Sequence, residues 1–161
     1  MTLPSTAPLS SSQIENELGL SFPFSLDHPW ILALAGKINV PISFSDLLGK
    51  TGRYDGSLAT IDKGGVPDTL QINFPNSPFF DIHAQYAQYY YRFGYELDLW
   101  FDVQGTYWAG KNIMFKNNTT GAQVVLSPYG SGSPNLWISN SSVPNLIRAG
   151  ATDNYTILPS N

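Results

Sequence analysis

Three carboxylates on one predicted strand are the residues whose types and spacing come closest to an enzyme site. Glu96, Asp98 and Asp102 share a face of the stretch YYYRFGYELDLWFDV, because side chains on a strand alternate between its two faces. A pair of carboxylates supplies the acid and the nucleophile or base of glycoside cleavage. The solvated face of an amphipathic strand carries the same residues. We favour that simpler role and expect no catalytic residue.

Metal and cofactor chemistry has little support in the sequence. Asp81 and His83 stand two residues apart and would share a strand face, where they could ligate a metal ion. The chain has only two histidines and no cysteine, so a surface or hydrogen-bonded histidine is the favoured interpretation. Walker, Rossmann and nucleophile-elbow motifs are absent from the sequence. We therefore expect no metal and no cofactor.

Aromatic residues near predicted turns are the second chemical signal. Tyr107, Trp108, Tyr129 and Trp137 lie beside or between predicted strands. Exposed tyrosine and tryptophan rings suit stacking on sugars or docking to a protein partner. The alternative is that the rings complete the core, and we favour it, although position in the sequence does not decide between the two. The four residues stay candidates for contact with a ligand or receptor.

The composition restricts the classes of partner. Charged residues make up 12% of the chain and aromatic residues 14%, with a net charge of −4, which indicates a folded protein with a neutral polar surface. The eight lysines and arginines form no cluster, so nucleic-acid binding is not expected. No apolar run reaches the ~18 residues of a membrane span. The N-terminus lacks the pattern of a signal peptide, and we expect a protein that stays soluble in the cytoplasm until assembly.

The elements that must position these side chains change character along the chain. Residues 66–161 show the period-two alternation of strands, most clearly in residues 89–103, where the odd-numbered residues are apolar. This pattern predicts an antiparallel β-sandwich of jelly-roll type. Residues 51–65 are rich in glycine and are expected to be a linker. The predicted fold is therefore mainly β, with a small helical module before the sandwich.

Residues 1–50 predict three short helices that form a docking module. Ser10 with Gln13, and Ser43 with Asp46, have the spacing of a capping box, and the middle segment DHPWILALAG places a proline in its first turn. Isolated helices below ~12 residues are marginal in water, so these helices need a packing partner. The predicted docking residues are Ile14, Leu18, Trp30, Ile31, Leu34, Leu47 and Leu48.

The first 50 residues resemble the N-terminal module of tail and baseplate-associated proteins of tailed bacteriophages. The matching residues are Leu3-Pro4-Ser5, Pro8-Leu9-Ser10-Ser11-Ser12-Gln13-Ile14, Glu17-Leu18-Gly19, Leu34-Ala35-Gly36, Pro41-Ile42-Ser43-Phe44-Ser45-Asp46-Leu47 and Gly49-Lys50. The remaining residues match no particular family.

This resemblance implies a structural, non-enzymatic component of a virion assembled in the host bacterial cytoplasm. The expected location is the tail, tail tip or tail fibre, where the helices dock and the β-domain is displayed, with a possible role in host-surface binding. Its expected partners are other virion proteins, further copies of the chain in the particle, and a host-surface glycan or protein. The alternatives are a capsid decoration protein and a carbohydrate-binding or glycan-degrading tail module.

Overall fold

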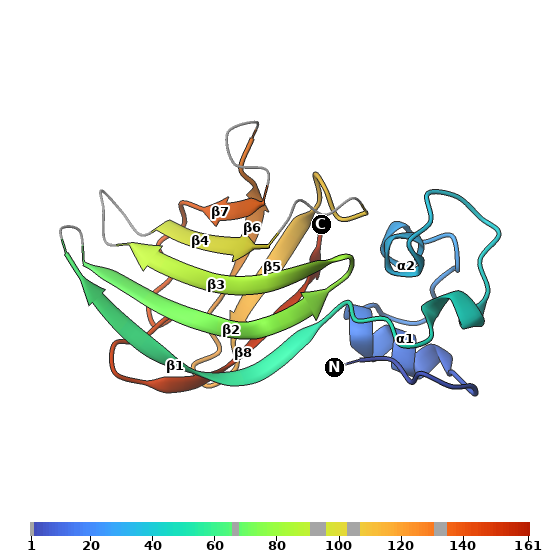
Figure 1. Ribbon diagram of the computed structural model, residues 1–161, viewed down its shortest axis with the longest axis horizontal. Helices are drawn as coiled ribbons and strands as arrows, with labels where there is room; N and C mark the ends of the chain where they lie inside the picture. The colour runs from blue at the N-terminus through green and yellow to red at the C-terminus, as the bar shows by residue number, and fades with distance from the viewer. Residues whose placement is uncertain (1, 66–67, 91–95, 103–106, 131–134) are drawn as a thin grey trace.

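The computed structural model describes residues 2–65, 68–90, 96–102, 107–130 and 135–161. Within these residues, eight antiparallel strands form a closed barrel in the order β1-β2-β3-β4-β7-β6-β5-β8 (Figure 1). The strands are β1 Tyr54–Gly64, β2 Thr69–Phe79, β3 Ile82–Tyr90, β4 Glu96–Phe101, β5 Asn112–Asn117, β6 Gln123–Pro128, β7 Leu136–Ser139 and β8 Thr152–Ser160. Two helices and one 3₁₀ turn precede them: α1 Ser11–Leu18, α2 Pro29–Ala35 and η1 Phe44–Leu47.

The mainly-β prediction is confirmed, but the predicted three helices and open sandwich are wrong. The described residues contain two α-helices, and the third predicted helix is the 3₁₀ turn η1. The sheet closes where β1 pairs with β8, with Tyr54 opposite Ile157. Alternation of apolar and polar residues indicates that one face of each strand is buried, and the strands of a barrel and of a sandwich share this property. The sequence pattern therefore could not distinguish between them.

Residues 51–65 are not a linker, because most of this segment is β1. The strand pairs with β2 on one side and β8 on the other, and its second half is exposed, which weakens the alternation. Gly56 has a packing role here: a Cβ at this position would overlap the side chain of Tyr54. The glycine that favoured a linker prediction instead lets Tyr54 fold along the strand into the core.

The long strand predicted over residues 89–103 is two strands, β3 and β4. They pair antiparallel, with Tyr90 opposite Glu96. In the second half of β3 the inward-facing residues are Ala87 and Tyr89, which have the same odd-numbered parity as those of β4, so the alternation gave no sign of the reversal. The described members of the predicted apolar face are indeed buried, namely Tyr89, Leu97, Leu99 and Phe101. Tyr91, Phe93, Tyr95 and Val103 lie outside the described residues.

The predicted caps determine how the N-terminal helices begin and end. Ser10 and Gln13 form a complete capping box on α1, with the Ser10 N–H donating to Gln13 Oε1 at 2.8 Å. Gly19 ends the helix in the left-handed conformation at φ 66°. Ser43 and Asp46 form the same box, but the chain is extended at Leu48. The second copy of the pattern therefore supports one 3₁₀ turn.

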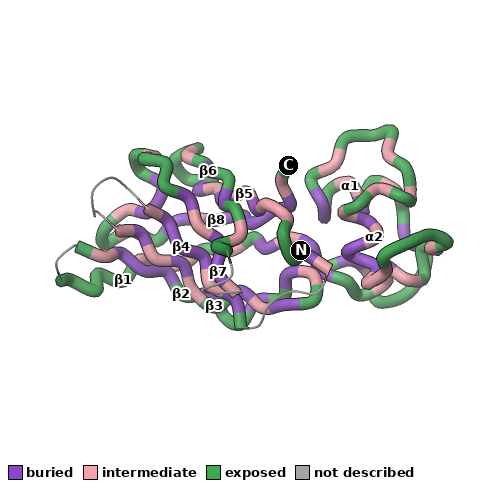
Figure 2. The backbone as a smooth tube through the Cα atoms, turned by 90° about the horizontal axis from the view of Figure 1, so that it is seen from above, coloured by how far each residue is buried: buried purple, intermediate pink, exposed green. Residues whose placement is uncertain are grey.

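The helical segment, residues 2–50, packs against one end of the barrel (Figures 1 and 2). It has its own hydrophobic cluster, separate from the cluster that fills the barrel. Trp30 packs against both clusters and joins them. Within the described residues, no helix has the length and apolar character needed to cross a membrane.

Candidate functional site

The predicted docking residues lie inside the helical segment. Five of the seven are buried: Ile14, Leu18, Ile31, Leu34 and Leu47. Trp30 and Leu48 are half-buried and pack against the same cluster. The helices therefore pack their apolar faces against one another and against Leu3 and Leu9. These faces are not a free docking surface.

The exposed apolar residues of the helical segment lie between α1, α2 and η1 or, for Phe44, at the first residue of η1. We define the outer apolar set as Phe22, Ile38, Val40 and Phe44, whose exposed fractions are 69%, 82%, 55% and 39%. Three of them lie in residues 38–44, and the segment between α2 and η1 runs along the edge of the molecule farthest from the barrel (Figure 1). The sequence carried a signal for this set, because Phe22, Ile38 and Val40 fall outside the helical periodicity.

Glu17 fixes the helical segment to the start of the barrel. Its side chain is fully buried, and Oε1 accepts hydrogen bonds from the backbone N–H groups of Gly52 at 2.7 Å and Arg53 at 3.1 Å. Burial raises the pKa of the Glu17 carboxyl, against the opposing effect of these two donors. The Arg53 guanidinium donates in turn to the carbonyl of Asn16 at 3.0 Å. These bonds connect α1 to the segment that enters β1.

We expect Glu17→Ala to lower the free energy of unfolding by about 3 kcal/mol, because it leaves a buried N–H without an acceptor. Glu15→Ala is the matched control on the same helix, since Glu15 is half-buried, and should change stability by less than about 0.5 kcal/mol. Urea unfolding of both variants measures the difference. Equal losses in the two variants would contradict the role given to Glu17.

A surface cleft lies between α2 and the segment 107–111, which is gold in Figure 1. Two adjoining cavities of about 320 and 470 Å³ share Lys37, Ile38 and Tyr107. We call the two together the α2 cleft; its lining is Pro29, Leu32, Ala33, Gly36, Lys37, Ile38, Asn39, Tyr107 and Lys111. Such volumes are within the range of ligand sites.

Tyr107 is held in the α2 cleft by its backbone. Its N–H donates to Asp81 Oδ2 at 3.2 Å, and its carbonyl accepts from Lys111 Nζ. The ring packs beside Gly36, where an added Cβ would stand 3.3 Å from a ring carbon. Among the four candidate aromatics, Tyr107 is thus the one placed in a described cavity.

The other candidate aromatics divide between core and surface. Trp108 and Trp137 are 0% and 1% exposed, so they are core residues and their candidacy for receptor contact was wrong. Trp108 stacks on Phe80 with ring centroids 4.2 Å apart, and Trp137 Nε1 donates to the Lys111 carbonyl at 2.8 Å. Tyr129 is 47% exposed and is available for contact. All four aromatic residues lie near predicted turns, and nothing in the sequence shows which of the four rings point into the core.

The three candidate carboxylates do not converge on one site. Glu96 and Asp98 lie two residues apart on β4, and burial, with a contribution from the charge of Glu96, raises the pKa of Asp98, while Asp102 accepts from the His83 backbone N–H at 2.9 Å and pairs with its ring at 3.1 Å. Asp102 is held by His83, which leaves Glu96 and Asp98 as the remaining two of the three candidates.

Asp98 is buried on the outer face of the sheet, opposite Gln88 and Ile138. Burial, with a further contribution from the charge of Glu96, raises its pKa to about 7. One Asp98 oxygen and the Nε1 of Trp100 are enclosed without a partner in the described residues. The rings of Tyr86 and Trp100, on the paired strands β3 and β4, stack on each other with their centroids 5.8 Å apart. This environment favours a protonated Asp98 below neutral pH.

We expect stability to fall between pH 5 and pH 8, because folded Asp98 holds a proton up to pH 7 whereas an unfolded aspartate loses it near 3.8. The contribution is fully present below pH 3.8 and is lost as the pH rises through 7, a change on the order of 2 kcal/mol between pH 5 and 8. Asp98→Asn should remove this loss. Thermal unfolding at both pH values measures it, with exposed Asp68→Asn as control. An unchanged pH dependence in Asp98→Asn would count against a protonated Asp98.

Asp81 and His83 also make separate contacts. Asp81 accepts from Tyr107, whereas His83 pairs with Asp102. In the part of the chain that the structure describes, no three His, Asp or Glu side chains form a group that could hold a metal ion.

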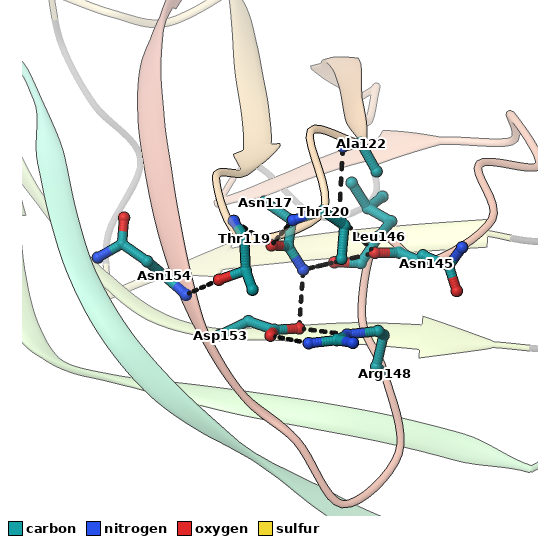
Figure 3. Close-up of polar contacts among 9 residues, drawn as sticks. All are labelled: Asn117, Thr119, Thr120, Ala122, Asn145, Leu146, Arg148, Asp153 and Asn154. Carbon is teal, nitrogen blue, oxygen red and sulfur yellow. Dashed lines mark hydrogen bonds and ion pairs between the residues drawn. The ribbon is translucent and has the colours of Figure 1, made fainter.

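A buried polar network that sequence reasoning missed closes the end of the barrel opposite the helical segment (Figure 3). Asn117 Nδ2 donates to Asp153 Oδ2 at 2.9 Å and to the Leu146 carbonyl at 3.1 Å, and Asn117 Oδ1 accepts from the backbone N–H groups of Thr119 and Thr120. The hydrogen bond from Arg148 is the main reason why the pKa of Asp153 lies below its usual value. The network anchors the segment between β7 and β8, and its role is structural.

The surface features that remain as functional candidates are the outer apolar set, the α2 cleft and Tyr129. Only Tyr107 and Tyr129 among the originally predicted candidate residues belong to them. The lysines of the cleft, Lys37 and Lys111, were not predicted because they are 74 positions apart in the sequence. Comparison of the chain with protein-family models, curated proteins and solved structures finds no match in any of the three.

Proposed function

We propose that the chain is a non-enzymatic structural protein of a tailed-bacteriophage virion, located in the tail, tail tip or tail fibre. The helical segment attaches it to neighbouring virion proteins, and the barrel is displayed. The observation that carries this proposal is the outer apolar set. Of the seven large, exposed apolar side chains in the described residues, four belong to it. Three of these four lie within residues 38–44, and exposed apolar side chains that lie together mark protein contact sites.

The attachment surface differs from the one that the helix pattern predicted. The apolar helix faces are buried in their own cluster. The contact with a neighbouring virion protein is therefore made by the outer apolar set. The phage-module resemblance of residues 1–50 supports the class of partner. The contacts of Asp102 with His83 support the non-enzymatic part of the proposal, because this candidate carboxylate is already engaged within the chain.

The proposal is tested in particles of the phage or prophage that encodes the chain. A variant with Phe22→Ser, Ile38→Ser, Val40→Ser and Phe44→Ser should fold, because these side chains are exposed, but should be lost from purified particles by at least tenfold in quantitative mass spectrometry. The matched control is Ile61→Ser, Val125→Ser and Tyr129→Ser, which removes the exposed apolar residues of the barrel and should leave incorporation unchanged.

Two results would contradict the proposal. One is normal incorporation of the quadruple variant. The other is deletion of the gene with no loss of an appendage in electron micrographs and no loss of infectivity. The copy number per particle separates a tail protein from a capsid decoration protein, which covers the head in many copies.

A further inference from the structure

The α2 cleft combines an apolar floor with two cations. Leu32 and Ala33 of α2 and the ring of Tyr107 supply apolar surface. Lys37 and Lys111 supply the charges, and no carboxylate belongs to the lining among the described residues. The chain as a whole carries a net charge of −4, so two lysines without an acidic neighbour in the lining are a local exception. An occupant that is both apolar and anionic complements this surface.

Both cations have a contact within the chain, and Lys111 Nζ donates to the Tyr107 carbonyl. Asp46 pairs with Lys37 at 3.0 Å, with side chains 27% and 40% exposed, and Asp81 accepts from the backbone of Tyr107. An exposed pair of this kind is worth about 0–1 kcal/mol, so a partner carboxylate can compete with Asp46 for Lys37. Lys111 lies 5.5 Å from the centre of the Trp108 ring, which fixes its position at the cleft.

The cleft is continuous with the outer apolar set. Ile38 lines both of its cavities and is the most exposed member of that set, at 82%. Val40 follows two residues later. A chain that contacts the outer apolar set can therefore extend into the cleft without leaving the protein surface, which favours a polypeptide occupant over a separate small ligand.

We propose that the α2 cleft receives a segment of a partner virion protein in which an apolar side chain is flanked by aspartate or glutamate. The apolar side chain packs against Leu32, Ala33 and Tyr107, and the flanking carboxylates pair with Lys37 and Lys111. Aromatic anchors at the centre of an interface commonly dominate its binding energy, and Tyr107 has that position. This inference rests on the proposed function and adds the chemistry of the partner.

Site-specific photo-crosslinking in assembled particles tests the inference. Benzoylphenylalanine replaces Ile38, and after irradiation the crosslinked peptide is sequenced by mass spectrometry. We expect a peptide from a different virion protein, with an acidic residue within about three positions of the crosslinked apolar residue. The same probe at Val125, an exposed position on β6, is the control and should not yield this peptide.

A charge variant gives an independent measurement. Lys37→Gln with Lys111→Gln should reduce incorporation into particles about tenfold, and Lys63→Gln with Lys116→Gln, which removes the same charge from the barrel, should not. If the first variant loses stability, Lys37→Gln alone tests the inference, since its side chain is exposed; a threefold reduction is expected.

The outcomes separate this inference from the proposed function. A chain absent from wild-type particles overturns both. A chain present in particles overturns only the inference if the crosslink joins a second copy of the chain, if the peptide lacks acidic residues, if no crosslink forms, or if the lysine variants incorporate normally.

Discussion

Trp108→Ala is expected to lower the free energy of unfolding by about 4 kcal/mol, which corresponds to a fall in melting temperature of about 8–16 °C for a chain of this size. Trp108 is fully buried and its ring contacts those of Phe80 and Trp30 at centroid distances of 4.2 and 6.4 Å. Trp30 belongs to the contact between the barrel and the helical segment. Truncation therefore removes packing inside the barrel and at this contact.

Tyr129→Ala is the matched control, because Tyr129 is also an aromatic residue beside a strand end but is 47% exposed. It should change stability by less than about 0.5 kcal/mol. Urea unfolding of the two variants measures the difference. If Trp108→Ala were as stable as the parent chain and instead lost binding to host cells, Trp108 would be a surface contact and the assignment to the core would be wrong.

Asn117→Ala is expected to cost about 3–5 kcal/mol, because it removes several buried hydrogen bonds at once and leaves their partners unsatisfied. Asn117 has no exposed surface and connects the ends of β5 and β8 to the segment before β8 (Figure 3). That segment carries Leu146 and Ile147, which are buried in the barrel core. Loss of the network should therefore release core residues as well as polar bonds.

Asn140→Ala is the control for this second prediction, since it makes the same substitution at an asparagine that is exposed. It should be as stable as the parent chain. Hydrogen exchange of the Leu146 and Ile147 amides provides a local readout and should accelerate in Asn117→Ala alone. A loss below about 1 kcal/mol in Asn117→Ala would show that the network does not anchor the barrel end.

Local patterns predicted local structure well. The spacing of Ser10, Gln13 and Gly19 identified the beginning and end of α1, because a capping box and a left-handed glycine are satisfied by neighbours in the sequence. The alternation at Leu97, Leu99 and Phe101 identified the residues that face the core. Neither inference required knowledge of residues far along the chain.

Features that depend on long-range pairing could not be predicted in this way. Closure of the barrel requires Tyr54 to pair near Ile157, about a hundred positions away, and no local pattern specifies such a pair. The docking prediction failed for a related reason. Ile14 and Leu47 were predicted to need an external partner, but they lie in one cluster within the chain. The α2 cleft likewise forms only when α2 and Lys111 are brought together.

Our central proposal is that the helical segment attaches the chain to a virion and that the barrel is displayed. Its structural basis is the separation of the two hydrophobic clusters and the exposure of Phe22, Ile38 and Val40. Exposed apolar side chains on this segment are what a surface for contact with another protein requires.

Electron cryomicroscopy of the assembled particle tests this claim most directly. We predict density for the barrel on the tail, tail tip or tail fibre, with residues 20–44 in contact with a neighbouring virion protein and the barrel facing outward. A reconstruction with residues 20–44 exposed to solvent and the barrel enclosed between subunits would contradict the claim, as would purified particles that contain no copy of the chain.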